Sequence, residues 1–197
     1  LFDRDVWEDY SNDSTNKRRN FYSDFVSRKL LNLIYEFGCA SGPNLMNIQK
    51  NVKEKVFLVG YDINRKAIKK AKKEFDLNNS FFFDNLTHSK IEEILKKQKR
   101  LFFDLVIFDR VFFLFSEEEI TKHLSEYEKY YKFVILDDFH NKKRKMKFRT
   151  YSTKDYVKLF SNFELISIEK SEHIINSEFF RLNAKRIVFR NKRLRSR

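Results

Sequence analysis

A short turn near residue 40 carries the residues best suited to holding a ligand. Gly38, Ala40 and Gly42 are spaced two apart, and Pro43 follows directly. Small residues at this spacing let the backbone turn tightly and approach a ligand closely. We expect a helix to begin at Pro43, because proline suits a first helical turn, and such a helix presents free N–H groups to a polar or anionic group. The turn therefore predicts a ligand site between a strand and a helix.

Two familiar phosphate-binding turns do not fit this segment. A dinucleotide fingerprint, Gly-x-Gly-x-x-Gly, would need glycine at the positions of Ala40 and Pro43, and the Gly-Lys-Ser/Thr ending of a P-loop does not follow. An acidic residue, Asp62, closes an apolar run 20 positions after Gly42. A carboxylate at the end of the second strand of a Rossmann-like sheet holds a ribose hydroxyl pair. These residues favour a nucleoside-type ligand without a pyrophosphate.

The composition gathers the rare residues of this chain around the same turn. The chain has 197 residues, and its three glycines, one proline and one cysteine all lie between positions 38 and 60. One cysteine excludes an internal disulfide framework and a multi-cysteine zinc site. No apolar run approaches the length of about 18 residues that indicates a membrane span. No charged-then-apolar leader opens the chain, so we expect a cytoplasmic protein of one domain.

The elements that must position the turn alternate between strand and helix from residue 30 onward. Nearly continuous apolar strands separated by helices are typical of a mainly parallel sheet covered on both faces. The last two predicted strands have no helical pattern between them, so we expect the final strand to be antiparallel. The predicted strands are 31–37, 56–61, 80–83, 103–108, 133–136, 163–168 and 185–189, and the predicted capping boxes are Ser89 with Glu92, Ser116 with Glu119 and Ser152 with Asp155.

Residues 36–71 carry a family resemblance. The segments are Glu36-Phe37-Gly38-Cys39-Ala40-Ser41-Gly42, Gly60-Tyr61-Asp62-Ile63 and Ala67-Ile68-Lys69-Lys70-Ala71. In this order they resemble the class I S-adenosylmethionine-dependent methyltransferases, and the order of elements extends the resemblance over about residues 30–140. It implies an α/β, Rossmann-like three-layer sandwich with a mostly parallel seven-stranded sheet whose last strand is antiparallel. The implied cofactor is S-adenosylmethionine, with S-adenosylhomocysteine as its product.

The resemblance also implies which residues contact the cofactor. In the family the acidic, glycine-rich turn holds the methionine end, the acid after the second strand holds the ribose, and one after the third strand meets the adenine. Ala40 stands where glycine is commoner, a small change that we expect the turn to tolerate. The competing interpretation is that the glycines merely make a turn and Asp62 caps the next helix. The implied cofactor-binding residues are Glu36, Gly38, Cys39, Ala40, Gly42, Asp62, Ile63, Asp84 and Asn85.

Candidate catalytic groups follow the fourth and fifth predicted strands, since active sites of open α/β sheets lie past the carboxyl ends of the strands. Methyl transfer from a sulfonium needs positioning and desolvation, and needs a base only where the acceptor must lose a proton. His140 is the first candidate for that base because imidazole titrates near neutrality, and Asp109 and Asp138 are the alternatives. A solvated histidine without a catalytic role is the competing interpretation. We expect no metal at Asp137, Asp138 and His140, and we expect His88, His123 and His173 to be surface residues.

Two basic runs contribute to the formal net charge of +13. Lys142–Arg149 follows the fifth predicted strand, and Arg190–Arg197 ends the chain. The first run either recruits an anionic acceptor or is a solvated loop of a lysine-rich chain. On the first interpretation, Arg110, Arg149 and Tyr151 bind the substrate. We expect the second run to be a solvated tail.

The resulting prediction is a methyltransferase domain over residues 31–197 with an N-terminal helical extension, or lid, over residues 1–30. We expect it to methylate an oxygen or nitrogen of a small, anionic, sugar- or phosphate-bearing acceptor. Residues 136–160 are faintly similar to methyltransferases of bacterial surface-sugar pathways. Two alternatives stay open: an RNA methyltransferase, which the net charge supports, and a nucleotide- or nucleic-acid-binding module that lacks the chemistry. An Asn-Pro-Pro-Tyr-type motif is excluded because Pro43 is the only proline.

Overall fold

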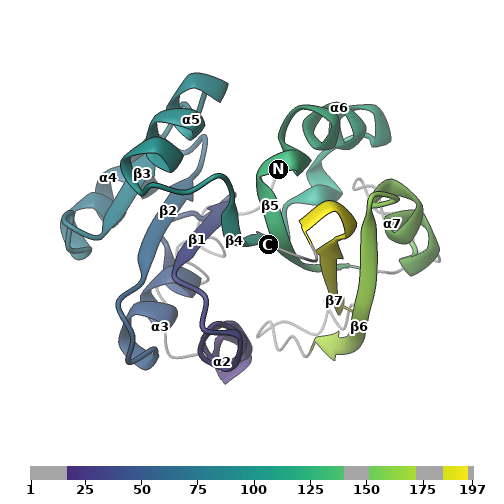
Figure 1. Ribbon diagram of the computed structural model, residues 1–197, viewed down its shortest axis with the longest axis horizontal. Helices are drawn as coiled ribbons and strands as arrows, with labels where there is room; N and C mark the ends of the chain where they lie inside the picture. The colour runs from purple at the N-terminus through teal and green to yellow at the C-terminus, as the bar shows by residue number, and fades with distance from the viewer. Residues whose placement is uncertain (1–16, 140–150, 172–183, 195–197) are drawn as a thin grey trace. The chain divides into compact units, whose positions relative to one another are not determined.

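The computed structural model describes residues 17–139, 151–171 and 184–194. These residues hold seven strands, which join one sheet in the order β3-β2-β1-β4-β5-β7-β6 (Figure 1). The pairs β1–β2, β2–β3 and β4–β5 are parallel, and β7 is antiparallel to both of its neighbours. The α/β class and the mostly parallel seven-stranded sheet with an antiparallel last strand are thereby confirmed.

The chain divides into two compact units, and the first covers residues 1–94. Its N-terminal part is helical, as expected: η1 leads directly into α2, which packs beside α3 (Figure 1). Three parallel strands then alternate with helices. The elements are η1 (Lys17–Arg19), α2 (Asn20–Lys29), β1 (Leu33–Phe37), α3 (Pro43–Asn51), β2 (Phe57–Tyr61), α4 (Arg65–Glu74) and β3 (Ser80–Phe83), with α5 (His88–Lys97) at the boundary.

The second unit covers residues 95–197. Every residue of β4 is buried, as expected for a strand covered on both faces. Phenylalanine rings fill the core around it: Phe160 stacks on Phe189 with centroids 4.7 Å apart, and Phe108 lies 4.4 Å from Phe112. The elements are β4 (Phe103–Asp109), η2 (Phe112–Leu114), α6 (Glu117–Tyr127), η3 (Glu128–Tyr130), β5 (Tyr131–Phe139), α7 (Thr153–Leu159), β6 (Phe163–Ser171), β7 (Ala184–Asn191) and η4 (Lys192–Leu194).

Two of the three predicted capping boxes are confirmed. Ser116 with Glu119 begins α6, and Ser152 with Asp155 begins α7. The box at Ser89 is wrong, because α5 already begins at His88 and Ser89 lies inside it. Thr87 stands just before the helix and its hydroxyl oxygen accepts a hydrogen bond from Lys90 N at 3.4 Å. A hydroxyl two residues earlier therefore takes the place predicted for Ser89.

The fifth strand is longer than predicted, running over 131–139 instead of 133–136. Asp137 and Asp138 therefore lie within β5 and not after it. The antiparallel register sets Asp137 opposite Arg186 and Asp138 opposite Lys185. Cations on the partner strand favour acids at these two positions. The sequence of the fifth strand alone does not show these partners, so it predicts that the strand ends before the two acids.

Among the described residues, no helix combines the length and the apolar character that a membrane crossing requires.

His123 of α6 is half-buried within the second unit, and the expectation that it is a surface residue is wrong. Its Nε2 lies 2.9 Å from Tyr131 Oη, and its ring stands edge-on to Phe108 with centroids 5.7 Å apart. Burial lowers the pKa of His123 to about 4. The folded protein thus keeps a neutral imidazole over a pH range in which a histidine of the unfolded chain takes up a proton.

We expect the free energy of unfolding to fall as the pH is lowered from 6.5 to 4, because the unfolded state then binds the His123 proton more tightly than the folded state. The contribution of His123 to stability is fully present above the pKa of a histidine in the unfolded chain. Because the ring is only half-buried, the loss of stability should reach about 2 kcal/mol. Urea unfolding of the protein and of His123→Gln across this pH range checks this, because glutamine can still contact Tyr131 but does not titrate. Equal pH slopes for the two proteins would contradict it.

Candidate functional site

The turn between β1 and α3 has the backbone conformation that its small residues predict. Gly38, Ala40 and Gly42 all have positive φ angles, of 75°, 49° and 83°. Gly42 is the N-cap of α3, and Pro43 stands in its first turn, as expected. A residue with a Cβ in this left-handed region costs about 1–2 kcal/mol, which is the physical reason that glycine is commoner than alanine at the position of Ala40. The strain at Ala40 shows that the surrounding contacts hold the turn in place.

Gly60 of β2 has a different reason to lack a side chain. A Cβ at Gly60 would lie 2.6 Å from ring carbons of Phe82 and 2.8 Å from Cys39 Sγ. At Gly42 an added Cβ would lie 3.0 Å from the ring of Phe75, which packs on Phe82 with centroids 4.6 Å apart. The glycines thus let an aromatic pair support the turn. The clustering of glycine in this part of the chain follows from both turn geometry and packing.

Asp62 joins the turn to the end of β2. Its Oδ2 accepts a hydrogen bond from Ala40 N at 2.7 Å, and its Oδ1 accepts one from Asn64 N at 2.8 Å. A carboxylate has about four acceptor positions, so these two backbone bonds orient the half-buried group and leave it further acceptor capacity. The N-cap of α4 is Asn64, whose side chain accepts hydrogen bonds from Lys66 N and Ala67 N. The interpretation of Asp62 as that helix cap is therefore wrong.

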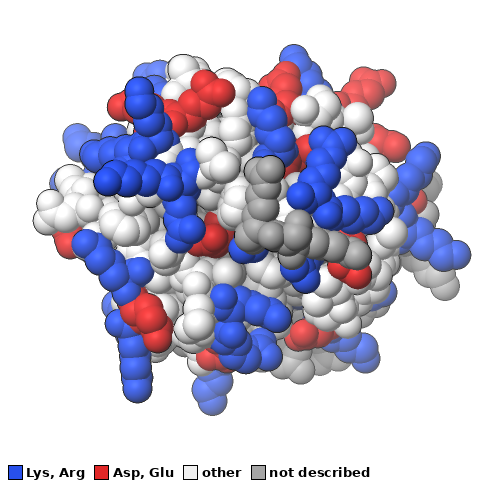
Figure 2. Space-filling view, viewed as in Figure 1, with Lys and Arg blue, Asp and Glu red and all other residues white. Residues whose placement is uncertain are grey.

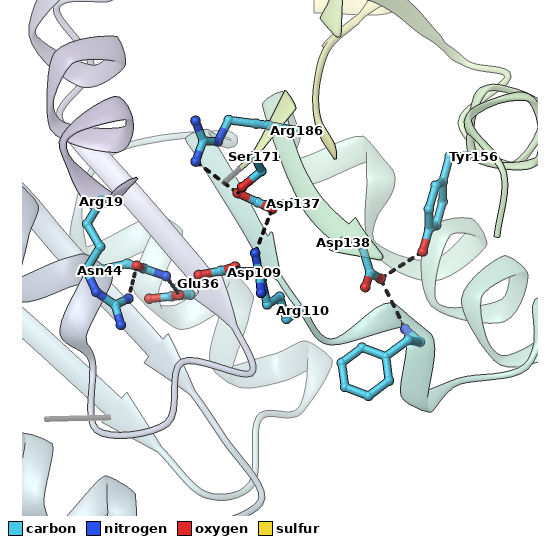
Figure 3. A network of polar contacts seen from close by, with 11 residues as sticks. Arg19, Glu36, Asn44, Asp109, Arg110, Asp137, Asp138, Tyr156, Ser171 and Arg186 are labelled. Carbon is cyan, nitrogen blue, oxygen red and sulfur yellow. Dashed lines mark hydrogen bonds and ion pairs between the residues drawn. The ribbon is translucent and has the colours of Figure 1, made fainter. Parts of the chain in front are cut away.

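Glu36 near the carboxyl end of β1 belongs to a buried polar network (Figure 3). Asn44 Nδ2 donates a hydrogen bond to Glu36 Oε1 at 2.6 Å, and Asn44 Oδ1 accepts one from Arg19 Nη1. Each of the three residues is 1% exposed. Sequence reasoning found Glu36 but missed Asn44 and Arg19. A polar residue in the first turn of α3, one position after Pro43, was a signal for Asn44, whereas Arg19 gave none.

The remaining cofactor candidates lie at the ends of β2 and β3. Ile63 is 83% exposed beside Asp62, an open apolar side chain suited to contact with the face of a base. Asp84 is paired with Arg65, whose Nε lies 3.2 Å from its Oδ2, and Asn85 is exposed. The first unit therefore contains every residue predicted to contact the cofactor, along the carboxyl ends of three adjacent parallel strands.

Cys39 contributes to the turn as a buried thiol. Burial raises its pKa well above the ordinary value, and the carboxylates of Glu36 and Asp62 raise it further. A protonated, enclosed thiol is a poor nucleophile. Its Sγ fills the space that Gly60 leaves open.

Asp138 is held by two donors in the second unit (Figure 3). Its Oδ2 accepts hydrogen bonds from Tyr156 Oη at 2.8 Å and from Phe113 N at 3.1 Å. Burial raises the pKa of Tyr156, and the Asp138 carboxylate raises it further, so the tyrosine is the donor. These contacts tie α7 and η2 to β5.

Asp109 and Asp137 are surrounded by cations. Arg110 Nε lies 3.6 Å from Asp109 Oδ1, and Arg110 Nη2 lies 3.5 Å from Asp137 Oδ1. Arg186 Nη2 and Ser171 Oγ both donate to Asp137 Oδ2, at 2.9 Å and 2.7 Å. Arg110 has a positive φ of 56°, and its backbone N–H donates to Asp137 O at 2.7 Å. This buried cluster holds as many arginines as carboxylates.

The other predicted residues divide into two groups. His140 and Arg149 lie outside the described residues, as does the run 142–149. Tyr151 is buried, donates its hydroxyl to Phe115 O at 2.9 Å and lies 5.3 Å from the ring of Tyr156. Within the part of the chain that the structure describes, no group of three or more His, Cys, Asp or Glu side chains is placed to hold a metal ion.

Comparison with known proteins gives a family and a set of structural neighbours. Residues 34–178 match the family model described as a methyltransferase domain. No curated protein sequence matches the chain.

Three solved structures illustrate the likeness of the fold. Magnesium protoporphyrin IX methyltransferase (ChlM) from Synechocystis PCC 6803, with bound S-adenosylmethionine, has a TM-score of 0.65 at 14% identity, over 90% of this chain and 80% of that one. The N-methyltransferase NodS from Bradyrhizobium japonicum WM9 has a TM-score of 0.64 at 15% identity, over 91% and 97%. The plantazolicin methyltransferase BpumL, in complex with a triazolic desmethylPZN analog and S-adenosylhomocysteine, has a TM-score of 0.66 at 13% identity, over 96% and 91%.

We expect Gly60→Ala to destabilise the protein by about 1–3 kcal/mol, because the added methyl group overpacks the space occupied by Phe82 and Cys39. Urea unfolding measures the change. The double variant Gly60→Ala/Phe82→Leu is the control, since a smaller side chain at 82 should recover part of the lost stability. A single variant as stable as the parent protein would show that this close approach does not constrain the turn.

Proposed function

The chain belongs to the methyltransferase domain family, and on that basis we propose that it transfers a methyl group to an oxygen or nitrogen of a small, anionic acceptor. It is an enzyme, and its cofactor is S-adenosylmethionine. Structural neighbours were crystallised with S-adenosylmethionine or with its product, S-adenosylhomocysteine. When bound, this cofactor supplies the electrophilic methyl group. The chain's own residues bind and orient the reactants.

The residues of the first unit suit the cofactor. The oriented Asp62 carboxylate has acceptor capacity for the two ribose hydroxyls, and Ile63 offers an apolar contact to adenine. Asp84 would accept from the adenine amino group, with Asn85 beside it. The turn from Gly38 to Gly42 would receive the methionine end, and Glu36 would face its ammonium group. These roles remain proposals based on the family resemblance and on the chemistry of the acceptors.

One observation carries the proposal of an anionic acceptor. The run 142–149 contains six Lys or Arg residues and no acid, and it begins three residues after Phe139, where β5 ends. Arg110 and Arg186 are paired with Asp109 and Asp137, so they contribute little net charge. We therefore propose that this run, with Arg149 as its last member, supplies the positive potential that attracts the anion. We propose that Arg110 and Tyr151 shape the acceptor site mainly through packing.

His140 remains the proposed general base for an acceptor that must lose a proton. Asp138 accepts hydrogen bonds from Tyr156 and Phe113, and Asp109 is paired with Arg110. An ion pair favours the charged carboxylate and makes it a weaker base. Both acids are therefore ranked below His140. An amine acceptor that reaches the site already neutral needs none of the three.

The size of the acceptor has its own support. The neighbours described above are named for a porphyrin and for plantazolicin, whereas none of the three names an RNA. Figure 2 shows Lys and Arg side chains spread over the viewed face with Asp and Glu among them, not gathered in one stripe. On this one face, the described residues form no basic stripe of the kind that is usual at a nucleic-acid interface. Together with the names of the neighbours, this leads us to rank a small acceptor above RNA.

We expect the protein to bind S-adenosylhomocysteine, and Asp62→Ala to weaken binding by about 1–3 kcal/mol through the lost ribose hydrogen bonds. Isothermal titration calorimetry measures this. Glu93→Ala, which removes an exposed carboxylate of α5, is the control and should bind like the parent protein. Asp62→Asn retains one acceptor oxygen and should fall between the two. Absence of binding to the unmutated protein would refute the proposed cofactor site.

The acceptor class can be tested with labelled S-adenosylmethionine. We expect label to enter nucleotide-linked sugars or phosphorylated metabolites, but not the same sugars without phosphate. We also expect Arg149→Ala to raise KM for the anionic acceptor while the fold of the protein changes little. Label in tRNA, falling steeply with added salt, would support an RNA methyltransferase instead. Tight cofactor binding without labelling of any acceptor would support a binding module.

A further inference from the structure

We propose that Arg19, from the N-terminal helical segment, is a positioning residue for the methionine end of the cofactor. It acts through Asn44 on Glu36, and we call these three residues the Arg19 relay. The inference rests on the proposed role of Glu36 toward the cofactor ammonium group.

The hydrogen-bonding chemistry of the relay fixes its direction. A guanidinium group only donates, so the Asn44 atom that faces Arg19 must be the amide oxygen. The amide NH2 then faces Glu36, to which it donates at 2.6 Å. The guanidinium, which only donates, and the Glu36 oxygen, which accepts, both require this orientation of the Asn44 amide, and the amide holds that carboxylate oxygen in place. Replacing Arg19 removes one of the two groups that anchor the amide.

Burial makes the Arg19 relay costly in free energy. Arg19 and Glu36 are each 1% exposed, and a buried charge costs several kcal/mol unless hydrogen bonds and an opposite charge offset it. Apolar side chains of similar volume would often pack at least as stably. In these hydrogen bonds the Asn44 amide lies between Arg19 and Glu36 and orients one oxygen of the carboxylate. An oriented carboxylate of this kind is what an ammonium group of a ligand requires.

Packing of the N-terminal helix holds Arg19 at the relay. Arg19 immediately precedes α2, whose side chains Tyr22, Phe25 and Val26 are buried. α2 lies beside α3, and Asn47 Nδ2 of α3 donates to Asn20 Oδ1 of α2 at 3.1 Å. Asn44 is itself in α3. Docking of α2 on α3 therefore places the guanidinium against Asn44, and the N-terminal extension becomes part of the cofactor site.

The test compares two ligands that differ only at the methionine end. S-Adenosylhomocysteine carries the amino-acid portion, whereas 5′-methylthioadenosine shares its adenosine and thioether but lacks that portion. We expect Arg19→Ala to weaken S-adenosylhomocysteine binding about tenfold or more, which is about 1.4 kcal/mol, and to change 5′-methylthioadenosine binding less than about twofold. Isothermal titration calorimetry with both ligands measures the difference between the two losses of affinity. Lys17→Ala, which removes an exposed cation of the same 3-10 helix, should change neither affinity.

Two further variants extend the test, and the first of them, Arg19→Lys, keeps it decisive if Arg19→Ala does not fold. Arg19→Lys retains a charge and a donor, so its loss of S-adenosylhomocysteine affinity should be intermediate, again without loss toward 5′-methylthioadenosine. Arg19→Ala/Asn44→Ala should bind S-adenosylhomocysteine about as weakly as either single variant, because both belong to one relay. Circular dichroism and urea unfolding establish that each variant is folded.

Each result has one interpretation. An equal loss of affinity for both ligands, or no loss for either, would overturn the role of Arg19 while leaving the cofactor site intact. Failure of the unmutated protein to bind S-adenosylhomocysteine would instead overturn the proposed function on which the relay rests. Additive losses in the double variant would show that Arg19 does not act through Asn44.

Discussion

The hydrogen bond from Ala40 N to Asp62 Oδ2 is the constraint on which the first unit depends. It can form only if the turn after β1 brings its backbone to the end of β2, which requires left-handed conformations at Gly38, Ala40 and Gly42. The same bond orients the carboxylate that would hold the ribose. Backbone N–H groups of Gly38 and Cys39 add to this by donating to Tyr61 O, at 2.8 Å and 2.9 Å. One set of contacts thus both shapes the turn and presents its acceptor.

The packing around this turn explains why glycine and phenylalanine complement each other in this chain. The ring of Phe82 occupies the space beside Gly60, and Phe75 packs on Phe82 close to Gly42. The rings fill the space beside the turn, and this packing helps to hold the strained conformation of Ala40. Ligand-binding geometry and core packing are here two consequences of the same residues.

Features that depend on local chemistry could be predicted from the sequence. The spacing of Gly38 and Gly42, the carboxylate of Asp62 and the capping box at Ser116 each have a local meaning, and the mainly parallel sheet followed from the alternation of strands and helices. The predicted capping box at Ser89 was wrong because Thr87 offers an equivalent hydroxyl two residues earlier. The contact of Arg19 with Asn44 spans 25 positions, and no periodicity or motif marks such a pair before the chain is folded.

The two units hold their carboxylates in different ways, and this difference fits the proposed division between cofactor binding and acceptor recognition. Asp62 is held by backbone N–H groups, which any sequence with the same turn can supply. The fold of the backbone therefore fixes the orientation of this carboxylate. Asp137 is held by the side chains of Arg186 and Ser171, and Asp138 is held by the Tyr156 hydroxyl together with Phe113 N. Substitution of such side chains changes the charge and shape of a site without changing the backbone. On the proposed function, side-chain changes in the second unit would alter the acceptor, whereas the backbone contacts of the first unit would keep the cofactor the same.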